Sequence, residues 1–233
     1  MTDTVQSQAA TASSRGDFLD PTTLLRVVTG FLIAYIAATL LALVFRGLEY
    51  RMLVQFASGL IPSADVAAEA KASDAIVELT GGLRALVFFV TLIPFGMWIY
   101  RANRNARTLG AVGMKHSPGW SVGSYFVPIV NLFVPFLSMR EIWRASLNPD
   151  NPESAPTTPL LGWWWFLWLG HNVSGWIAAL MLKSIHTLDM ALDASLVAAA
   201  QNVFGIAVAV VALLLVRRIT ENQLMQSRLV EVF

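Results

Sequence analysis

The sequence predicts an all-α integral membrane protein: a bundle of four transmembrane helices with one proline-broken segment that is re-entrant or interfacial. Three observations predict this class. The 233 residues are 56% hydrophobic and 13% charged, the mean hydropathy is +0.60, and apolar runs long enough to cross a bilayer recur along the chain. A net charge of +1 gives no reason to expect a nucleic-acid partner, and the absence of Cys excludes disulfides and thiol chemistry.

The chain divides into a tail and one membrane domain. Residues 1–20 are rich in Ser, Thr, Ala and Gln without an apolar core, which predicts a disordered N-terminal tail rather than a cleaved signal. Residues 21–233 form the membrane domain. Its first span, residues 24–45, follows the helix-start signal Asp20-Pro21 and is long enough to cross a hydrocarbon core of roughly 30 Å.

Residues 47–82 are richer in acid than the spans. Apolar residues recurring every four positions, from Leu48 to Leu60, predict a short interfacial helix, and the Ala-rich piece from Ser63 to Leu79 predicts a solvated one. Gly81-Gly82 should then break the helical structure before the next span.

Three further apolar runs complete the predicted bundle, at 83–100, 160–182 and 197–216. The first has Arg84 near one end and Pro94 inside. The second opens with an aromatic belt typical of the headgroup level, formed by Trp163, Trp164, Trp165 and Trp168.

Residues 120–139 decide the topology. Gly123, Pro128, Asn131 and Pro135 interrupt this apolar segment. If it crosses, there are five spans and seven of the sixteen Lys and Arg lie on the side of the N-terminus; if it enters and leaves on one face, there are four spans and eleven of the sixteen lie on the cytoplasmic side. Because positive charge favours the cytoplasmic side, we predict the second arrangement, with both termini cytoplasmic.

The residues around this segment resemble a known family. The resemblance rests on Tyr100-Arg101-Ala102, Asn105-Ala106-Arg107, Leu109-Gly110-Ala111, Ser117-Pro118-Gly119-Trp120, Val127-Pro128-Ile129, Asn131-Leu132, Pro135 and the run Arg140-Glu141-Ile142-Trp143-Arg144-Ala145-Ser146. Together they are similar to the bacterial membrane family called domain of unknown function 4328. Ser124-Tyr125 stands where a Trp pair is expected. The resemblance implies a multi-pass protein of the bacterial inner membrane and implies no activity.

Two basic clusters flank the broken segment. Arg101, Arg104 and Arg107 recur every three residues and, with Lys115, predict a cationic patch for anionic lipid or a protein partner. Ordinary positive-inside topology is the alternative explanation. The second cluster, Arg140 and Arg144, has the same two explanations.

Glu141 is an isolated acid among these basic residues. We predict a structural ion pair with Arg101, Arg104 or Arg107, with a catalytic carboxylate as the less favoured alternative because no nucleophile or second acid accompanies it.

Other polar residues fall near or within the apolar segments. Asn103, Asn105 and Asn131 are expected to bond backbone groups freed by prolines, and His171 and Asn172 to face other helices. His186, Asp189 and Asp193 have a helical spacing that could offer three metal ligands, but no further His lies close in sequence, and we predict no metal.

These observations favour a non-enzymatic, multi-pass protein of the cell membrane that acts as a scaffold or regulatory partner and needs no cofactor. It would hold anionic lipid, a membrane protein or a second copy at its basic face. The alternative is a small transporter or channel-like unit, with the broken segment lining a path past Asn131 and His171.

Overall fold

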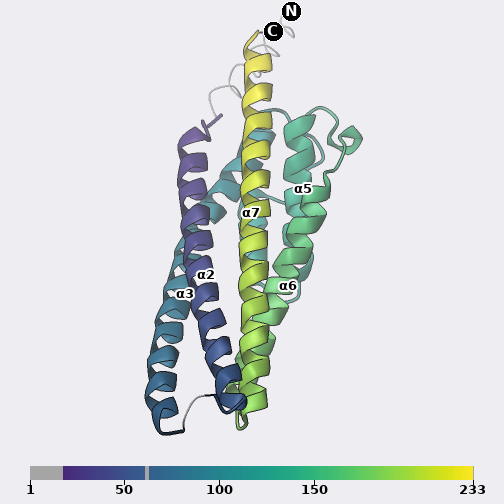
Figure 1. Ribbon diagram of the computed structural model, residues 1–233. Helices are drawn as coiled ribbons and strands as arrows, with labels where there is room; N and C mark the ends of the chain where they lie inside the picture. The colour runs from purple at the N-terminus through teal and green to yellow at the C-terminus, as the bar shows by residue number, and fades with distance from the viewer. Residues whose placement is uncertain (1–17, 61–62, 233) are drawn as a thin grey trace, which may run out of the picture. The chain divides into compact units, whose positions relative to one another are not determined.

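Every regular element in the described part of the chain is helical, which confirms the predicted all-α class (Figure 1). This computed structural model describes residues 18–60 and 63–232, so residues 1–17 of the predicted tail lie outside it. The long helices are α2 (Thr22–Ala57), α3 (Ser63–Thr108), α6 (Pro159–Met181) and α7 (Leu188–Val232). The shorter elements are α4 (Pro118–Gly123), η1 (Ser124–Phe126), η2 (Val130–Leu132), α5 (Val134–Leu147), η3 (Pro152–Ser154) and η4 (Leu182–Ser184).

Three of the described helices are long and apolar enough to cross a membrane. They are α2, the Glu69–Thr108 part of α3 and the Leu188–Leu229 part of α7. Helix α6 does not reach the same hydropathy, because His171, Asn172 and several Gly and Trp residues interrupt its apolar run. The protein is therefore a membrane protein by composition, with three of the four predicted spans supported.

Helix α2 is longer than its predicted span. It continues past residue 45 to Ala57, so the separate interfacial helix predicted for residues 48–60 does not form. The helix ends where Gly59 has a φ of +73°. The Gly59 N–H donates to the carbonyl of Phe56 and the Leu60 N–H donates to that of Gln55, both at 3.0 Å, as in a Schellman cap.

Helix α3 runs without interruption through Gly81-Gly82, so the break predicted there is wrong. Neither glycine has a positive φ. A glycine inside a helix costs about 1 kcal/mol relative to alanine, which packing on either side can offset, and Thr80 and Thr91 are both buried. As a result Arg84 lies well inside a long helix rather than near the start of one.

Asp20 caps α2 as predicted. Its carboxylate accepts hydrogen bonds from the Thr22 N–H at 2.8 Å and from the Thr22 hydroxyl at 2.9 Å. These two bonds, helped by the charges of Arg101 and Arg26, hold the pKa of Asp20 below its ordinary value.

The chain forms two compact units. Among the described residues, unit 1 comprises those of the stretches Met1–Thr29, Ile93–Gly162 and Leu213–Phe233, and unit 2 comprises those of Gly30–Leu92 and Trp163–Ala212. Unit 1 therefore contains the start of α2, the end of α3, all of α4 and α5, and the end of α7.

The core of unit 1 joins α3, α5 and α7. Trp98 of α3 is buried, and its indole N–H donates to the Thr220 hydroxyl of α7 at 3.1 Å. Gln223 of α7 is also buried and donates to the Ala102 carbonyl at 2.7 Å and to the Ser146 hydroxyl at 3.0 Å. These hydrogen bonds fix three helices in register where water is excluded.

Small residues allow close helix packing in unit 2. A Cβ added to Gly170 would lie 2.9 Å from the Phe204 ring, and one added to Gly175 would lie 2.5 Å from the Gln201 amide. Such close approach of α6 to α7 is typical of membrane helices. In the same unit Trp164 is buried, so only part of the predicted tryptophan belt is exposed.

Candidate functional site

Residues 118–147 fold into a hairpin, which we call the 118–147 hairpin. Helix α4 is capped at its N-terminus by Ser117, whose hydroxyl accepts from the Trp120 N–H, and it packs against α5. The hydroxyl of Ser121 lies 2.6 Å from that of Ser138. The chain therefore turns back on itself and does not continue as one straight helix through residues 120–139.

The two ends of the hairpin lie close together. Val112 precedes the hairpin and Pro149 follows it, and the Val112 N–H donates to the Pro149 carbonyl at 3.3 Å. The predicted broken backbone is present, in the form of two short 3-10 turns between α4 and α5.

The tip of the hairpin is apolar and exposed. Phe126, Ile129 and Phe133 are 72%, 75% and 61% exposed. Ile129 has a φ of 67° and a ψ of −50°, and the Val130 N–H donates to the Pro128 carbonyl at 2.8 Å, which together define a γ-turn. A β-branched residue in this conformation is strained, and the turn holds its side chain outward.

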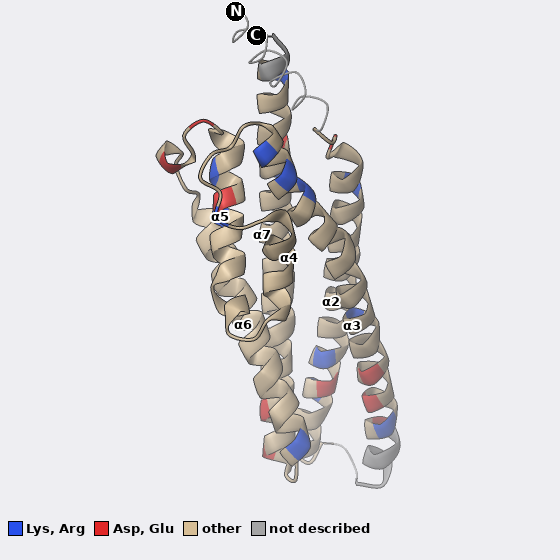
Figure 2. Ribbon diagram, turned by 180° about the vertical axis from the view of Figure 1, so that it is seen from behind, with Lys and Arg blue, Asp and Glu red and all other residues tan. Residues whose placement is uncertain are grey.

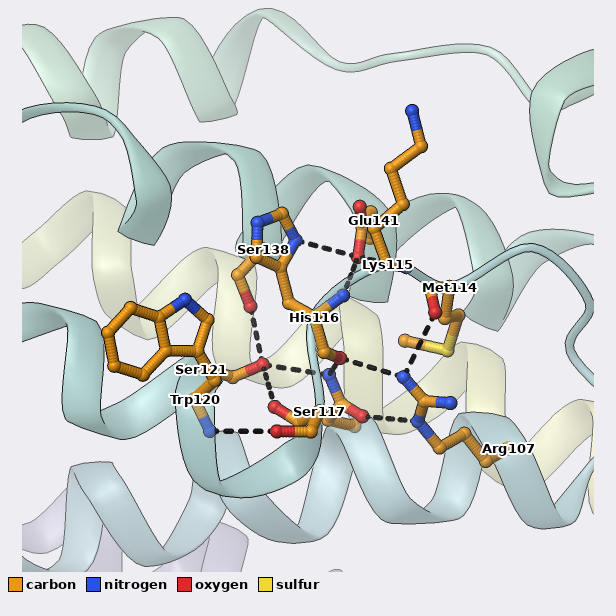
Figure 3. A network of polar contacts seen from close by, with 10 residues as sticks. Arg107, Met114, Lys115, His116, Ser117, Trp120, Ser121, Ser138 and Glu141 are labelled. Atoms are coloured by element: carbon orange, nitrogen blue, oxygen red, sulfur yellow. Dashed lines mark hydrogen bonds and ion pairs between the residues drawn. The ribbon is translucent and has the colours of Figure 1, made fainter. Parts of the chain in front are cut away.

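A polar network fills the other end of the hairpin (Figure 3). Its centre is Asn103 of α3, which is fully buried. The Asn103 amide donates to the His116 carbonyl at 3.0 Å and to the Ser121 hydroxyl at 2.8 Å, and its oxygen accepts from Nε of Arg107 at 3.0 Å. Asn103 therefore connects α3 to the loop before α4 and to α4 itself.

Glu141 of α5 closes this network. Its Oε2 accepts from the backbone N–H groups of Lys115 at 3.2 Å and His116 at 3.1 Å. Nδ1 of His116 lies 2.9 Å from the same oxygen without an aligned hydrogen bond, a contact that is an ion pair when the ring is protonated. The predicted partners were Arg101, Arg104 and Arg107, whereas the ion-pair partner found in the described part of the chain is His116.

The reason for this difference lies in the loop that joins α3 to α4. It brings residues 115 and 116 over the side chain of Glu141, while Arg107 donates to the carbonyls of Met114 at 3.2 Å and His116 at 2.8 Å. Arg107 is therefore engaged in shaping the loop. A pattern of charges along the sequence cannot reveal this arrangement, because backbone groups supply most of the partners.

The other predicted basic residues have different surroundings. Arg101 donates to the Asp20 carbonyl at 3.4 Å, and the Arg140 guanidinium lies 5.8 Å from the centre of the Phe136 ring. Nε of Arg144 is buried without a hydrogen-bond partner among the described residues. Lys115 is exposed, and Figure 3 shows its side chain pointing away from the network.

The amides of Asn105 and Asn131 bond backbone carbonyls outside the long helices. Asn105 donates to the Leu19 carbonyl at 2.8 Å and accepts from the Leu19 N–H at 3.2 Å, which fixes the segment before α2. Asn131 donates to the Tyr125 carbonyl at 3.2 Å within the hairpin tip. The Leu19 carbonyl is not one that a proline leaves free, whereas the Tyr125 carbonyl lies three residues before Pro128, which has no N–H to bond it in the 3-10 turn.

The polar residues predicted within α6 separate onto two faces. His171 and Ser174 are buried, whereas Asn172 is exposed and donates to the Trp168 carbonyl at 2.7 Å. Asn172 was expected to face other helices; it does not, because it lies about 100° around the helix from His171. His171 belongs to unit 2 and Asn131 to unit 1.

The predicted absence of a metal site stays a prediction. His186 precedes α7, so it does not share a helix face with Asp189 and Asp193. In the described side chains no group of three His, Asp or Glu residues is placed to hold an ion.

Several residues of the network were not predicted. His116, Ser121 and Ser138 carry no sequence pattern of their own, although Ser117-Pro118 is a helix-start signal that could have located α4. Gln223, near the end of α7, gives no signal at all because its partners lie in distant helices.

Comparison with known proteins identifies the family. The family described as "Domain of unknown function (DUF4328)" matches residues 62–221, which include α3, the hairpin, α6 and most of α7. We found no significant match among curated proteins or among solved structures. Since the match covers more than half of the chain, this membrane protein belongs to the DUF4328 family.

Proposed function

We propose that the protein is a four-span membrane scaffold whose unit 1 binds anionic lipid headgroups on the cytoplasmic face. The 118–147 hairpin would enter the bilayer from that face without crossing it. The observation that carries the proposal is the polarity of this hairpin along its length: an exposed apolar tip at one end, and basic residues with a polar network at the other.

The distribution of charge between the units supports this orientation. The stretches of unit 1 hold eleven of the sixteen Lys and Arg residues, whereas those of unit 2 hold five, with seven of the fifteen acids. Figure 2 shows these charges along a ribbon that is otherwise largely uncharged. The eleven basic residues are the ones that the four-span topology assigns to the cytoplasm.

The dimensions of the hairpin support partial insertion. Helix α5 has 14 residues and is therefore about 21 Å long, less than a hydrocarbon core of roughly 30 Å. Its first turns, next to the exposed Phe126, Ile129 and Phe133, suit the acyl region. Arg140, at the middle of α5, suits the phosphate level.

The four-span topology requires α6 to cross as well. Its 23 residues extend about 34 Å, and its exposed side chains include Trp163, Phe166 and Trp176. The polar residues His171 and Ser174 lie on its buried face, as expected of a helix whose other face meets lipid.

Lipid binding is tested by neutralising three basic residues of unit 1. In the triple variant Arg104→Gln, Lys115→Gln, Arg140→Gln we expect affinity for phosphatidylglycerol to fall by roughly 100-fold. Each cation near an anionic surface contributes about 1 kcal/mol. The measurement is native mass spectrometry of protein released from nanodiscs of stated phosphatidylglycerol content, at fixed salt.

A matched control uses three basic residues of unit 2, Arg51→Gln, Lys71→Gln and Lys183→Gln. It changes the net charge equally and should leave lipid retention near the wild-type value. Equal losses in both triple variants would mean that net charge alone attracts the lipid, and the proposed site in unit 1 would be wrong.

A further inference from the structure

A groove lies between α2 and α3 within unit 2, near the loop that joins the two helices. The helices run antiparallel, and the Thr91 hydroxyl of α3 donates to the Phe31 carbonyl of α2 at 3.4 Å. Because both helices rise about 1.5 Å per residue, this contact places residue 51 of α2 roughly level with residue 71 of α3. The groove therefore lies where α2 has left its apolar run and α3 has not yet reached its own.

One part of the groove is apolar. Its lining there comes from Phe45, Leu48 and Met52 of α2 and from Ile76 of α3. Leu48 and Ile76 are 50% and 41% exposed. Phe45 is the last residue of the apolar run 24–45, so the groove begins at the edge of the hydrocarbon core. It then rises through the headgroup layer, which adds about 5 to 7 Å on each side of the core.

The groove also contains one cation and one anion. Arg51 of α2 and Glu69 of α3 both line it, are both exposed, and lie at nearly the same level. Among the described side chains, neither has an opposite charge within 4.0 Å. Arg46, earlier in α2, differs because its guanidinium lies 2.6 Å from Oε2 of Glu49. Within the described part of the chain, Arg51 and Glu69 are therefore left open to a ligand that carries both charges.

Gln55 and Ser73 complete the polar lining. Gln55 lies one turn after Arg51 on α2, and Ser73 lies one turn after Glu69 on α3. An amide and a hydroxyl can each accept a hydrogen bond from an ammonium group or donate one to a phosphate oxygen. The groove therefore offers hydrogen-bonding groups beside each of its two charges.

We propose that this groove binds the headgroup of a phospholipid that carries a primary ammonium group, as phosphatidylethanolamine does. The phosphate lies on the Arg51 guanidinium and the ammonium on the Glu69 carboxylate, both as charge-assisted hydrogen bonds. The acyl chains start along Leu48 and Ile76. A choline headgroup has no N–H to donate to Glu69, and a lipid with a net negative charge is repelled by it. The site goes beyond the anionic-lipid site proposed for unit 1 and does not depend on it.

The size and position of the groove suit a headgroup rather than a whole lipid. Its volume is about 290 Å³, close to the roughly 300 Å³ at which small-molecule sites begin. Arg51 follows Phe45 by about 9 Å of helix, and its long side chain can bend back toward the phosphate level. A free zwitterion of the same size would gain nothing from the exposed Leu48 and Ile76.

The test measures the lipid that the full chain retains in native mass spectrometry after release from nanodiscs. The discs contain phosphatidylethanolamine and phosphatidylcholine in equal amounts, with the same acyl chains and at fixed salt. The wild type should retain phosphatidylethanolamine about tenfold better, which corresponds to one hydrogen bond to a charged group. Glu69→Gln should abolish this preference. Arg51→Gln should lower phosphatidylethanolamine retention by about tenfold, for the same reason, without lowering that of phosphatidylglycerol in discs that contain it.

Two variants of α3 are matched controls. Lys71→Gln and Glu78→Gln make the same chemical changes, but both residues lie about 180° to 200° around the helix from Glu69. They should keep the full preference for phosphatidylethanolamine. The four substituted side chains are exposed, so each variant should fold, and a melting temperature equal to that of the wild type checks this.

Three results would overturn the proposal. The first is equal retention of the two lipids by the wild type, and the second is a preference that Glu69→Gln leaves unchanged. The third is binding of soluble glycerophosphoethanolamine, in discs without phosphatidylethanolamine, as tightly as the lipid itself, which would assign the groove to a free zwitterion. None of these results changes the phosphatidylglycerol measurement on the unit 1 variants, so the two proposals can fail separately.

Discussion

Replacing Asn103 by Leu is expected to lower the free energy of unfolding by about 4 kcal/mol. Asn103 is fully buried and makes hydrogen bonds with His116, Ser121 and Arg107. Leucine has a similar size, so the loss is mainly that of polar contacts. The bonds to the Ser121 hydroxyl and the His116 carbonyl would be lost, while water can replace part of the bond to Arg107, which is exposed.

The measurement is equilibrium unfolding in mixed micelles, followed by tryptophan fluorescence. Asn172→Leu is the matched control, because Asn172 is exposed and its amide bonds only the carbonyl one turn earlier. We expect a change within about 0.5 kcal/mol for the control. If Asn103→Leu is as stable as the wild type, the polar network does not hold the hairpin to α3.

Replacing Glu141 by Ala should cost about 3 kcal/mol of unfolding free energy. The carboxylate accepts two backbone N–H groups and contacts His116, and its side chain is 20% exposed, so water compensates part of the loss. Removing it frees the loop that places Lys115 and His116 beside α5. Hydrogen exchange of the Lys115 and His116 amides should accelerate in the variant.

Two comparisons separate this effect from a general loss of charge. Glu221→Ala removes an exposed acid from α7 in the same unit and should change stability by less than about 0.5 kcal/mol. His116→Ala removes only the contact of the imidazole with Glu141 and should cost at most about 1 kcal/mol. Unchanged amide exchange in Glu141→Ala would contradict the assigned role of the carboxylate.

The helices could be predicted from the sequence better than their ends. Apolar runs located α2, α3, α6 and α7 because burial in lipid demands such runs. The ends failed where prediction relied on local signals: Gly81-Gly82 does not stop α3, whereas Gly59 and Gly110 do end helices, each with a positive φ. A glycine in the sequence therefore does not show by itself whether a helix ends there, because that depends on the tertiary packing of the residues that follow.

The site could be predicted in outline only. Counting charges indicated that residues 120–139 do not form a simple span, and the broken backbone of the hairpin agrees with that. The partner of Glu141 could not be inferred, because it depends on how the 109–117 loop folds over α5.

The central claim is that the 118–147 hairpin enters and leaves the membrane on the cytoplasmic side. The chain has no Cys, so single cysteines can be placed without other changes. Val112→Cys and Glu153→Cys put exposed thiols before and after the hairpin, and Lys71→Cys and Lys183→Cys put them in unit 2. Each variant is treated with a membrane-impermeant maleimide before and after the cells are opened. We predict labelling of positions 112 and 153 only in opened cells and of positions 71 and 183 in intact cells, whereas labelling of 112 and 153 from opposite sides would show that the segment crosses.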